Sequence, residues 1–192
     1  MPIRNQAALD FLLTRRSVPA KAMTGPVPGR DELETILTAA ARTPDHGALA
    51  PYRFIVLERP AIVRMMDEIR KAGERQGRPE AQIAKPMPHY EASSLAVVVA
   101  EKTDPEASVP VSEQTYTAGA VCLSLLNAAL ASGWGANWLS GWFSHDPVFR
   151  KDALGLAENE RIAGIVHIGT PKSEPSDRPR PDVSAITTWM AE

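Results

Sequence analysis

The chain has 192 residues, 44% of them hydrophobic, which is enough for one compact domain over residues 1–192 to bury most of its apolar surface. Its 21 basic and 23 acidic residues give a net charge of −2, which argues against nucleic acid or anionic lipid as a partner. Cys122 is the only cysteine, which excludes an intramolecular disulfide and a cysteine-bound metal cluster. We expect a cytoplasmic protein without a signal peptide or membrane span.

The first elements are predicted by helical spacing. Leu9, Leu12 and Leu13 follow Asn5, a plausible N-cap, and predict a helix over residues 6–14. Proline, glycine and small residues predict a loop over residues 14–29. Residues 30–41 have apolar side chains at i, i+3, i+4, i+7 and i+8 and acidic ones in the first turn, so they predict a second helix.

Strands and helices then follow one another. Aromatic and β-branched residues predict a strand over 52–58, and helical spacing returns over 60–75. The apolar run 94–101 indicates a strand covered on both faces. Residues 101–114 are polar and irregular, while 115–133 are apolar almost all round and predict a central buried helix.

The last part of the chain predicts two more strands. Residues 134–143 indicate a strand and a loop, and Asp146 is placed to cap a helix over 147–155. Residues 161–169 predict a further strand, which a tail without a clear pattern follows. This order favours an α+β fold over a doubly wound sheet. The dinucleotide, P-loop, zinc-protease and nucleophile-elbow motifs are all absent from the sequence.

Three polar clusters are candidates for binding. The first is Arg15, Arg16 and Ser17, whose guanidinium forks and hydroxyl suit a phosphate or a planar oxygen acceptor. The simpler explanation is that cations favour the end of a helix.

The second cluster is Arg42 with the turn that follows it. Asp45 in this turn can bond to its own backbone, which needs no ligand. His46 at the tip could stack on a ligand or donate to a carbonyl, although a lone histidine in a loop is usually a solvated side chain.

The third cluster is the segment DRPRPD, residues 177–182. Its prolines hold the backbone extended and would present Arg178 and Arg180 in a common direction to an anion. An exposed tail is the equal alternative.

Two further features have a structural and a functional interpretation. Trp134, Trp138 and Trp142 could cover an aromatic ligand, but tryptophans more often provide core and interface packing. His167 lies within an apolar strand, which favours a core histidine over a ligand-binding one.

Taken in order, these features resemble the FMN-dependent nitroreductase family, in particular its small single-domain bacterial members. The resemblance covers nearly the whole chain. It depends on RRS after the first helix, ARTPDHGALAPYRFIVL after the second, EQTYTAGAVCLSLLNAALASGWGANWLSG, and GTP before a tail that carries RPRPD.

The resemblance implies a fold, a partner and a cofactor. The fold would be a central mixed, mainly antiparallel sheet flanked by helices, in an intertwined homodimer with FMN at the subunit interface. The tail, about residues 171–192, would be extended and would contact both the partner and the cofactor. The turn matches a subgroup with Pro-Asp-His, and the part played by Lys21 stays open because Val18 and Pro19 separate it from the RRS segment.

The resemblance also implies roles for individual residues, and all of them concern the cofactor. Arg15, Arg16 and Ser17 would bind the FMN phosphate, ribityl chain and pyrimidine edge. Arg42 and His46 would reach the flavin from the partner subunit. Trp138, Leu139 and Ser140 would pass along the isoalloxazine ring, and Arg178 and Arg180 would bind the phosphate. No protein residue would be catalytic, and no metal is expected.

The implied activity is oxidation of NAD(P)H through bound FMN, with a nitroaromatic, a quinone or a similar acceptor, by a ping-pong mechanism. No motif selects between NADH and NADPH. Two alternatives stay open. One is another FMN reaction on the same scaffold, such as dehalogenation or flavin cleavage, and the other is a non-enzymatic dimer that binds flavin or another phosphate-bearing ligand.

Overall fold

The computed structural model describes residues 2–191, and its centre is one five-stranded sheet. The strands are β1 (Met23–Thr24), β2 (Tyr52–Glu58), β3 (Leu95–Lys102), β4 (Gly135–Leu139) and β5 (Glu160–Pro171). β5 pairs with β3 on one side and with β4 on the other, β2 pairs with β3 at the edge, and β1 pairs with the end of β5. All of these pairings between described strands are antiparallel. The predicted α+β fold with a mainly antiparallel sheet is confirmed.

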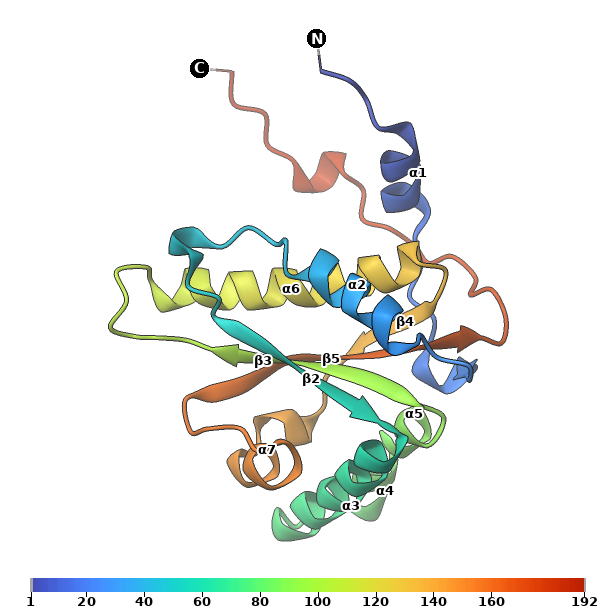
Figure 1. Cartoon of the computed structure of the whole chain (residues 1–192), viewed down its shortest axis with the longest axis vertical. Coiled ribbons are helices and arrows are strands. Elements are labelled where there is room, and N and C mark those ends of the chain that lie inside the picture. The colour runs from blue at the N-terminus through green and yellow to red at the C-terminus, as the bar shows by residue number, and fades with distance from the viewer. Residues whose placement is uncertain (1, 192) are drawn as a thin grey trace.

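Helices cover both faces of the sheet (Figure 1). On one face lie α2 (Arg30–Ala40) and α6 (Val111–Ala131). On the other lie α3 (Arg59–Arg75), α4 (Glu80–Ala84), α5 (Met87–Glu91) and α7 (Pro147–Leu154). The prediction of a strand covered on both faces is confirmed for β3. Its side chains alternate between the two layers, with Val97 and Val99 toward α2 and α6, and Val98 and Ala100 toward the other helices.

The two predicted helix caps are confirmed. The side chain of Asn5 accepts a hydrogen bond from the N–H of Ala8 at 3.1 Å, at the start of α1 (Gln6–Thr14). Asp146 accepts from the N–H groups of Val148 and Phe149 at 2.8 and 3.2 Å, at the start of α7. Each cap therefore satisfies N–H groups that have no partner inside the helix.

The start of α6 differs from its prediction. The helix begins at Val111, within the stretch predicted to be irregular. Gln114 is buried in its first turn, where its amide bonds to the backbone of Asp104 and Val109 at 2.8–2.9 Å. A polar side chain can be buried here because the oxygen and the nitrogen of its amide both form hydrogen bonds. The periodicity of apolar residues in the sequence does not reveal such hydrogen bonds.

The sequence-based assignment also missed three short elements. β1 lies within the predicted loop 14–29 and pairs at only two positions with β5. α4 and α5 are five residues each, in a segment that received no assignment. Their buried side chains, Ile83, Met87 and Tyr90, join the core beneath α3, so tertiary packing stabilises helices that are too short to show a periodic pattern.

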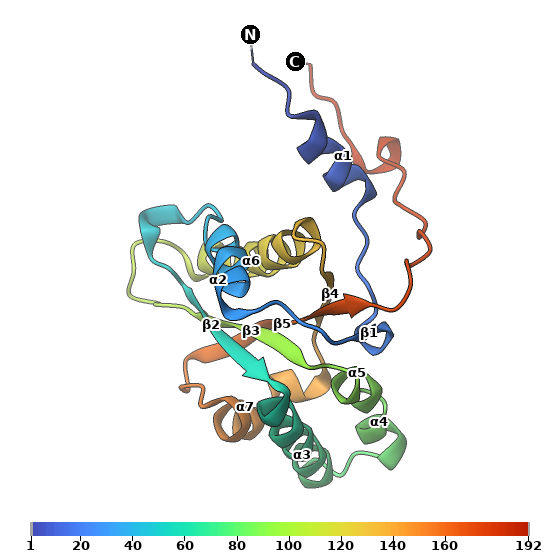
Figure 2. The ribbon, with the colours of Figure 1, turned by 45° about the vertical axis from the view of Figure 1, so that its right-hand side comes forward.

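The N-terminal helix and the C-terminal tail extend away from the sheet, close to each other (Figures 1 and 2). α1 buries none of its residues, and Leu12 and Leu13 are 58% and 72% exposed. The tail also exposes large apolar side chains, among them Ile186 and Trp189 at 71% and 90%. Within the described chain, no other element covers the apolar side chains that predict α1. Exposed apolar side chains of this kind are expected where another molecule binds.

Candidate functional site

The first and third clusters meet, although 160 residues separate them in the sequence. Arg16 donates from Nε and Nη2 to the carbonyl oxygen of Ser176 at 3.1 and 2.9 Å. The carboxylate of Asp177 lies 3.5 Å from Arg16 Nε and 3.2 Å from Arg180 Nη2. The loop after α1 and the tail therefore form one basic surface, which we call the arginine cluster and define as Arg15, Arg16, Ser17, Asp177 and Arg180.

The arginine cluster contains more positive charge than its single carboxylate can neutralise. Burial, and then the charges of Arg180 and Arg16, lower the pKa of Arg15. Nη2 of Arg15 donates to Ser17 Oγ at 3.1 Å, but its buried Nε has no partner among the described residues. The cluster thus contains three guanidinium groups but one carboxylate, which pairs with Arg16 and Arg180. An anion with several oxygen atoms, such as a phosphate, fits this arrangement chemically.

Arg178 lies outside these contacts. Its backbone N–H donates to Asp177 Oδ1 at 2.8 Å, and its side chain makes no hydrogen bond or ion pair with the described residues. The structure therefore brings Arg180 into the arginine cluster but not Arg178, and the two side chains differ in their surroundings in spite of the symmetrical proline pattern.

The end of β4 lies directly beside the arginine cluster. The backbone N–H of Val18, next to Ser17, donates to the carbonyl oxygen of Ala136 at 3.0 Å, and the side chain of Asn137 donates to the carbonyl oxygen of Val18 at 3.1 Å. Leu139 packs against Val18 and its neighbours. The loop that carries the arginine cluster is thus bonded to β4 and packs against Leu139.

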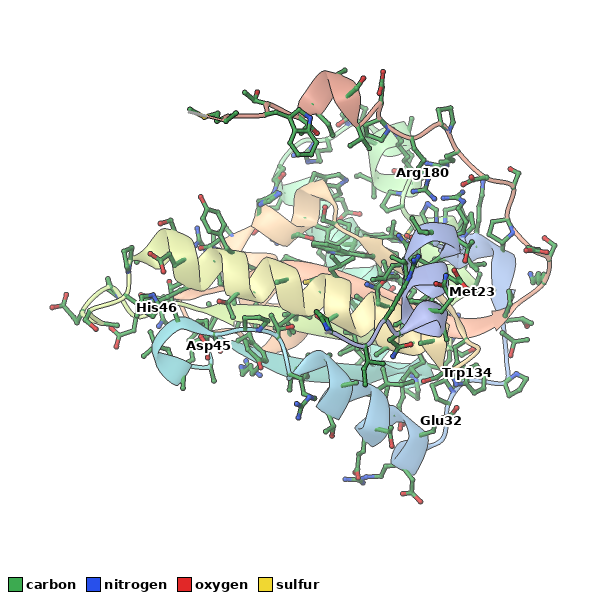
Figure 3. The ribbon with its side chains drawn as sticks, turned by 90° about the horizontal axis from the view of Figure 1, so that it is seen from above. Met23, Glu32, Asp45, His46, Trp134 and Arg180 are labelled. Atoms are coloured by element: carbon green, nitrogen blue, oxygen red, sulfur yellow. The ribbon has the colours of Figure 1, made fainter. Side chains whose placement is uncertain are left out.

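The three tryptophans have separate roles. The indole of Trp138 is 37% exposed and lies against Gly164 of β5, where any Cβ would overlap it. Trp134 Nε1 donates to Glu32 at 2.8 Å and joins β4 to α2 (Figure 3). Trp142 packs edge-to-face on Phe143 in the core. Only Trp138 lies among the predicted site residues.

The second cluster lies far from the first within the chain. Arg42 and His46 are exposed, and His46 and Arg180 lie at opposite ends of the view in Figure 3. His46 Nδ1 lies 2.7 Å from Glu113 Oε2, on α6. Asp45 accepts from the N–H of Ala50 at 2.7 Å, which confirms the self-bonded turn. Within one chain, His46 therefore lies away from Arg180 and the arginine cluster.

His167 is a core residue, as predicted. It is fully buried, and its Nδ1 bonds to Ser93 Oγ at 2.9 Å. Ser93 Oγ itself donates to the carbonyl oxygen of Leu95, so Nδ1 of His167 carries the proton. Burial, and then the charge of His89, lower the pKa of His167 to about 3. His167 therefore stays neutral, although its Nε2 has no partner among the described residues.

Two residues near the site, Lys85 and His89, escaped sequence reasoning, and Lys21, whose part the sequence leaves open, lies close to His89. The 3₁₀ turn Ala20–Ala22, which follows the arginine cluster, contacts α5 and brings Lys21 close to His89. Burial, and then the charge of Lys21, lower the pKa of His89. No sequence motif marks Lys85 or His89, because α4 and α5 follow no periodic pattern that would have placed them.

The described residues contain neither a candidate membrane span nor a candidate metal site. Across residues 2–191, no helix combines the length and the apolar character that crossing a membrane requires. Within the same range, no three histidine, cysteine, aspartate or glutamate side chains are grouped as metal ligands.

Comparison with known families decides how this surface is to be interpreted. The model described as "Nitroreductase family" matches residues 12–170, which include the first two clusters and all of β4. This chain belongs to the nitroreductase family. The matched region of this nitroreductase ends one residue before the end of β5, so the tail with Arg180 lies outside it.

Relatives of known name agree with the family. The Escherichia coli (strain K12) protein called "Putative NAD(P)H nitroreductase YdjA" is 31% identical over 184 residues, which cover 95% of this chain and 99% of the relative. A Haemophilus influenzae protein called "Putative NAD(P)H nitroreductase" is 35% identical over 164 residues, 85% of this chain and 88% of the relative. Both matches cover most of this chain.

Solved structures share the fold of this nitroreductase. A nitroreductase-like family protein from Bacillus cereus superposes with a TM-score of 0.83 at 22% identity and covers both chains completely. A Desulfovibrio desulfuricans protein, described as a nitroreductase in complex with FMN, has a TM-score of 0.73 at 21% identity over 98% of this chain and 99% of its own. At this level of identity the two matches support the fold.

Proposed function

We propose that this protein is an FMN-dependent NAD(P)H oxidoreductase of the nitroreductase type. Family membership supports the class of activity, and the complex of the D. desulfuricans protein supports the choice of flavin. The single observation that carries the proposal within this chain is the union of the arginine cluster with the end of β4. It brings an anion site and the strand β4 together in one part of the molecule.

The residues of this surface fit FMN. Arg15, Arg16, Ser17 and Arg180 would bind the phosphate, the ribityl chain and the pyrimidine edge, since guanidinium groups pair with phosphate and carbonyl oxygens. Trp138, Leu139 and Ser140 would lie along the isoalloxazine ring. The unpartnered Nε of Arg15 is the donor that such a ligand would satisfy. In this arrangement Arg178 would contribute long-range charge to the phosphate.

The proposed active form is a homodimer in which FMN lies between the subunits. Two observations support it. His46 lies away from Arg180 of its own chain (Figure 3), and His46 and Arg42 would complete the site of a partner. In addition, α1 and the tail, which extend away from the sheet in Figure 2, have exposed apolar side chains that a second subunit would cover.

The proposed reaction moves two electrons from NAD(P)H to an acceptor in alternating half-reactions. Bound FMN would supply the hydride chemistry, so the chain needs no nucleophile. The arginine cluster would stabilise negative charge on the pyrimidine edge, and the indole of Trp138 would limit access of water to the ring. The acceptor would be a nitroaromatic, a quinone or a similar compound, and we expect the enzyme in the cytoplasm.

The test is the visible spectrum of the purified protein, followed by chromatography of the chromophore released on denaturation. We expect FMN at about one per chain, and bleaching of its absorbance when NAD(P)H is added without oxygen. A protein that neither contains nor takes up FMN would contradict the proposal. A protein that binds FMN but does not react with NAD(P)H would instead be a flavin-binding dimer without turnover.

A further inference from the structure

A small pocket adjoins the surface proposed for the flavin ring. Its volume is about 290 Å³, near the lower limit for sites that bind small molecules. It lies between α4–α5 and the end of β4, and both Leu139 and Ser140 contribute to its wall. A molecule with one aromatic ring matches this size.

The pocket has positive charge without an acidic counterpart. Lys85 and His89 are its only ionisable side chains besides Tyr90, and no aspartate or glutamate lines it. Lys85 makes no ion pair with the described residues. Burial, and then the charge of Lys21, lower the pKa of His89, which favours the neutral imidazole as a hydrogen-bonding group, while Lys85 provides the charge.

Aromatic side chains form the rest of the wall. Tyr90, Trp142 and Phe143 line the pocket, and each packs edge-to-face on a neighbour, which fixes the orientation of the rings. The guanidinium of Arg78 lies 4.4 Å from the centre of the Trp142 ring, so the outer face of this indole is already covered. Planar apolar walls with a cation at the edge suit an aromatic ring that bears an anionic group.

We propose that this pocket binds the electron acceptor, and that Lys85 and His89 select aromatic acceptors with a carboxylate or a similar anionic substituent. The inference rests on the proposed function, because it places the acceptor next to the flavin. For a nitrobenzoate, the ring lies against Trp142, the carboxylate meets Lys85, and the nitro group points toward Ser140.

The reaction balances with the reductant already named. One NAD(P)H and one proton convert the nitro group to a nitroso group and release one water, and NAD(P)⁺ is the oxidised product. The carboxylate is unchanged and serves only for binding. A preference for anionic acceptors would therefore appear chiefly in KM and in kcat/KM.

The kinetic test compares para-nitrobenzoate with its methyl ester in the FMN-loaded enzyme. Lys85→Met should lower kcat/KM for the acid by about fivefold to tenfold and leave the ester within about twofold, since one charge-assisted contact is lost. Lys85→Arg retains the charge and should retain the preference. Lys102→Met, at the far end of β3, is the matched control and should change neither substrate. Equal effects of Lys85→Met on acid and ester would overturn the inference.

A binding experiment without turnover completes the test. Fluorine NMR of para-fluorobenzoate should show binding to the oxidised FMN-loaded wild type and to Lys102→Met, with weaker binding to Lys85→Met. Binding only to flavin-free protein, with displacement by FMN, would make the pocket part of the flavin site and overturn the inference. Loss of FMN uptake or of reduction by NAD(P)H would instead contradict the proposed function, and is detected before any acceptor is added.

Discussion

Arg16 and Ser176 are joined by two hydrogen bonds from one guanidinium to one carbonyl oxygen, at 3.1 and 2.9 Å. This contact fixes the tail beside the loop that follows α1. Arg180 comes near Arg15 as a result, and their mutual repulsion contributes to the lowered pKa of Arg15. A segment outside the matched family region thus completes the basic surface that we propose for FMN.

Replacement of Arg16 by alanine should weaken FMN binding. The variant loses a charge-assisted contact worth about 1.5 to 3 kcal/mol, which corresponds to roughly a tenfold or greater rise in the Kd for FMN. Fluorescence titration of flavin-free protein measures this change. Arg30→Ala is the control, because Arg30 is exposed and pairs only with Glu34 of its own helix. An unchanged Kd in Arg16→Ala would remove this residue from the site.

Hybrid dimers should show that two chains build each site. Arg16→Ala and Arg42→Glu chains should each bind FMN poorly alone, but their hybrid has one site with both defects and one site with neither. Copurification with two different tags should therefore yield a hybrid with about half of the wild-type FMN content. The control pairs wild type with a chain that carries both changes, so that every site has one defect. If the control hybrid contained as much FMN as the first hybrid, this result would contradict a site shared between two chains.

Much of the fold could be predicted from local signals, whereas the assembly of the site could not. The caps Asn5 and Asp146 and the apolar run of β3 act through neighbours in sequence, so pattern reasoning identified them. The residues of the arginine cluster were also recognisable by type. Their meeting depends on the course of the tail over the loop, which no spacing reveals. Lys85 and His89 went unnoticed because tertiary packing alone stabilises α4 and α5.

The stability of the protein should fall in acid through Glu160. Hydrogen bonds from Arg53, at 2.6 and 2.9 Å, are the main cause that lowers the pKa of this buried carboxyl from 4.5 to about 2. Because the folded state favours the ionised form, the contribution is complete above about pH 4.5 and is lost as the pH falls toward 2.

Glu160→Gln should therefore lower the free energy of unfolding by about 1.5 to 3 kcal/mol near neutral pH, and should flatten its decline in acid. Urea denaturation at several pH values measures both effects. Asp67→Asn is the control, since the side chain of Asp67 is 60% exposed and pairs with Arg70 of its own helix. A variant whose pH dependence matches that of the wild type would show that other carboxyl groups dominate acid unfolding.

The turn after His46 should gain stability from glycine. Ala48 and Ala50 have φ values of 53° and 47°, in the left-handed region that a Cβ disfavours. Ala48→Gly and Ala50→Gly should each raise the free energy of unfolding by up to about 1 kcal/mol, because relief of this strain outweighs the added freedom of the unfolded chain. Thermal denaturation compares them with Ala39→Gly in α2, which should be destabilised by about 1 kcal/mol. Destabilisation in all three variants would contradict the strained turn.

Gly164 and Trp138 should be energetically coupled, because the indole occupies the space that a Cβ on residue 164 would require. Gly164→Ala must displace the ring and should destabilise the protein by about 1 to 3 kcal/mol. In Trp138→Ala this space is free, so addition of Gly164→Ala to that variant should cost much less than it does in the wild type. Denaturant titration of the two single variants and the double variant gives the coupling energy.

Gly119→Ala, where a Cβ meets no atom of the chain within 4 Å, should leave the free energy of unfolding unchanged or raise it. A coupling energy near zero would mean that the indole of Trp138 does not lie against Gly164 of β5. The strand β4, proposed to line the flavin ring, would then present a different set of side chains.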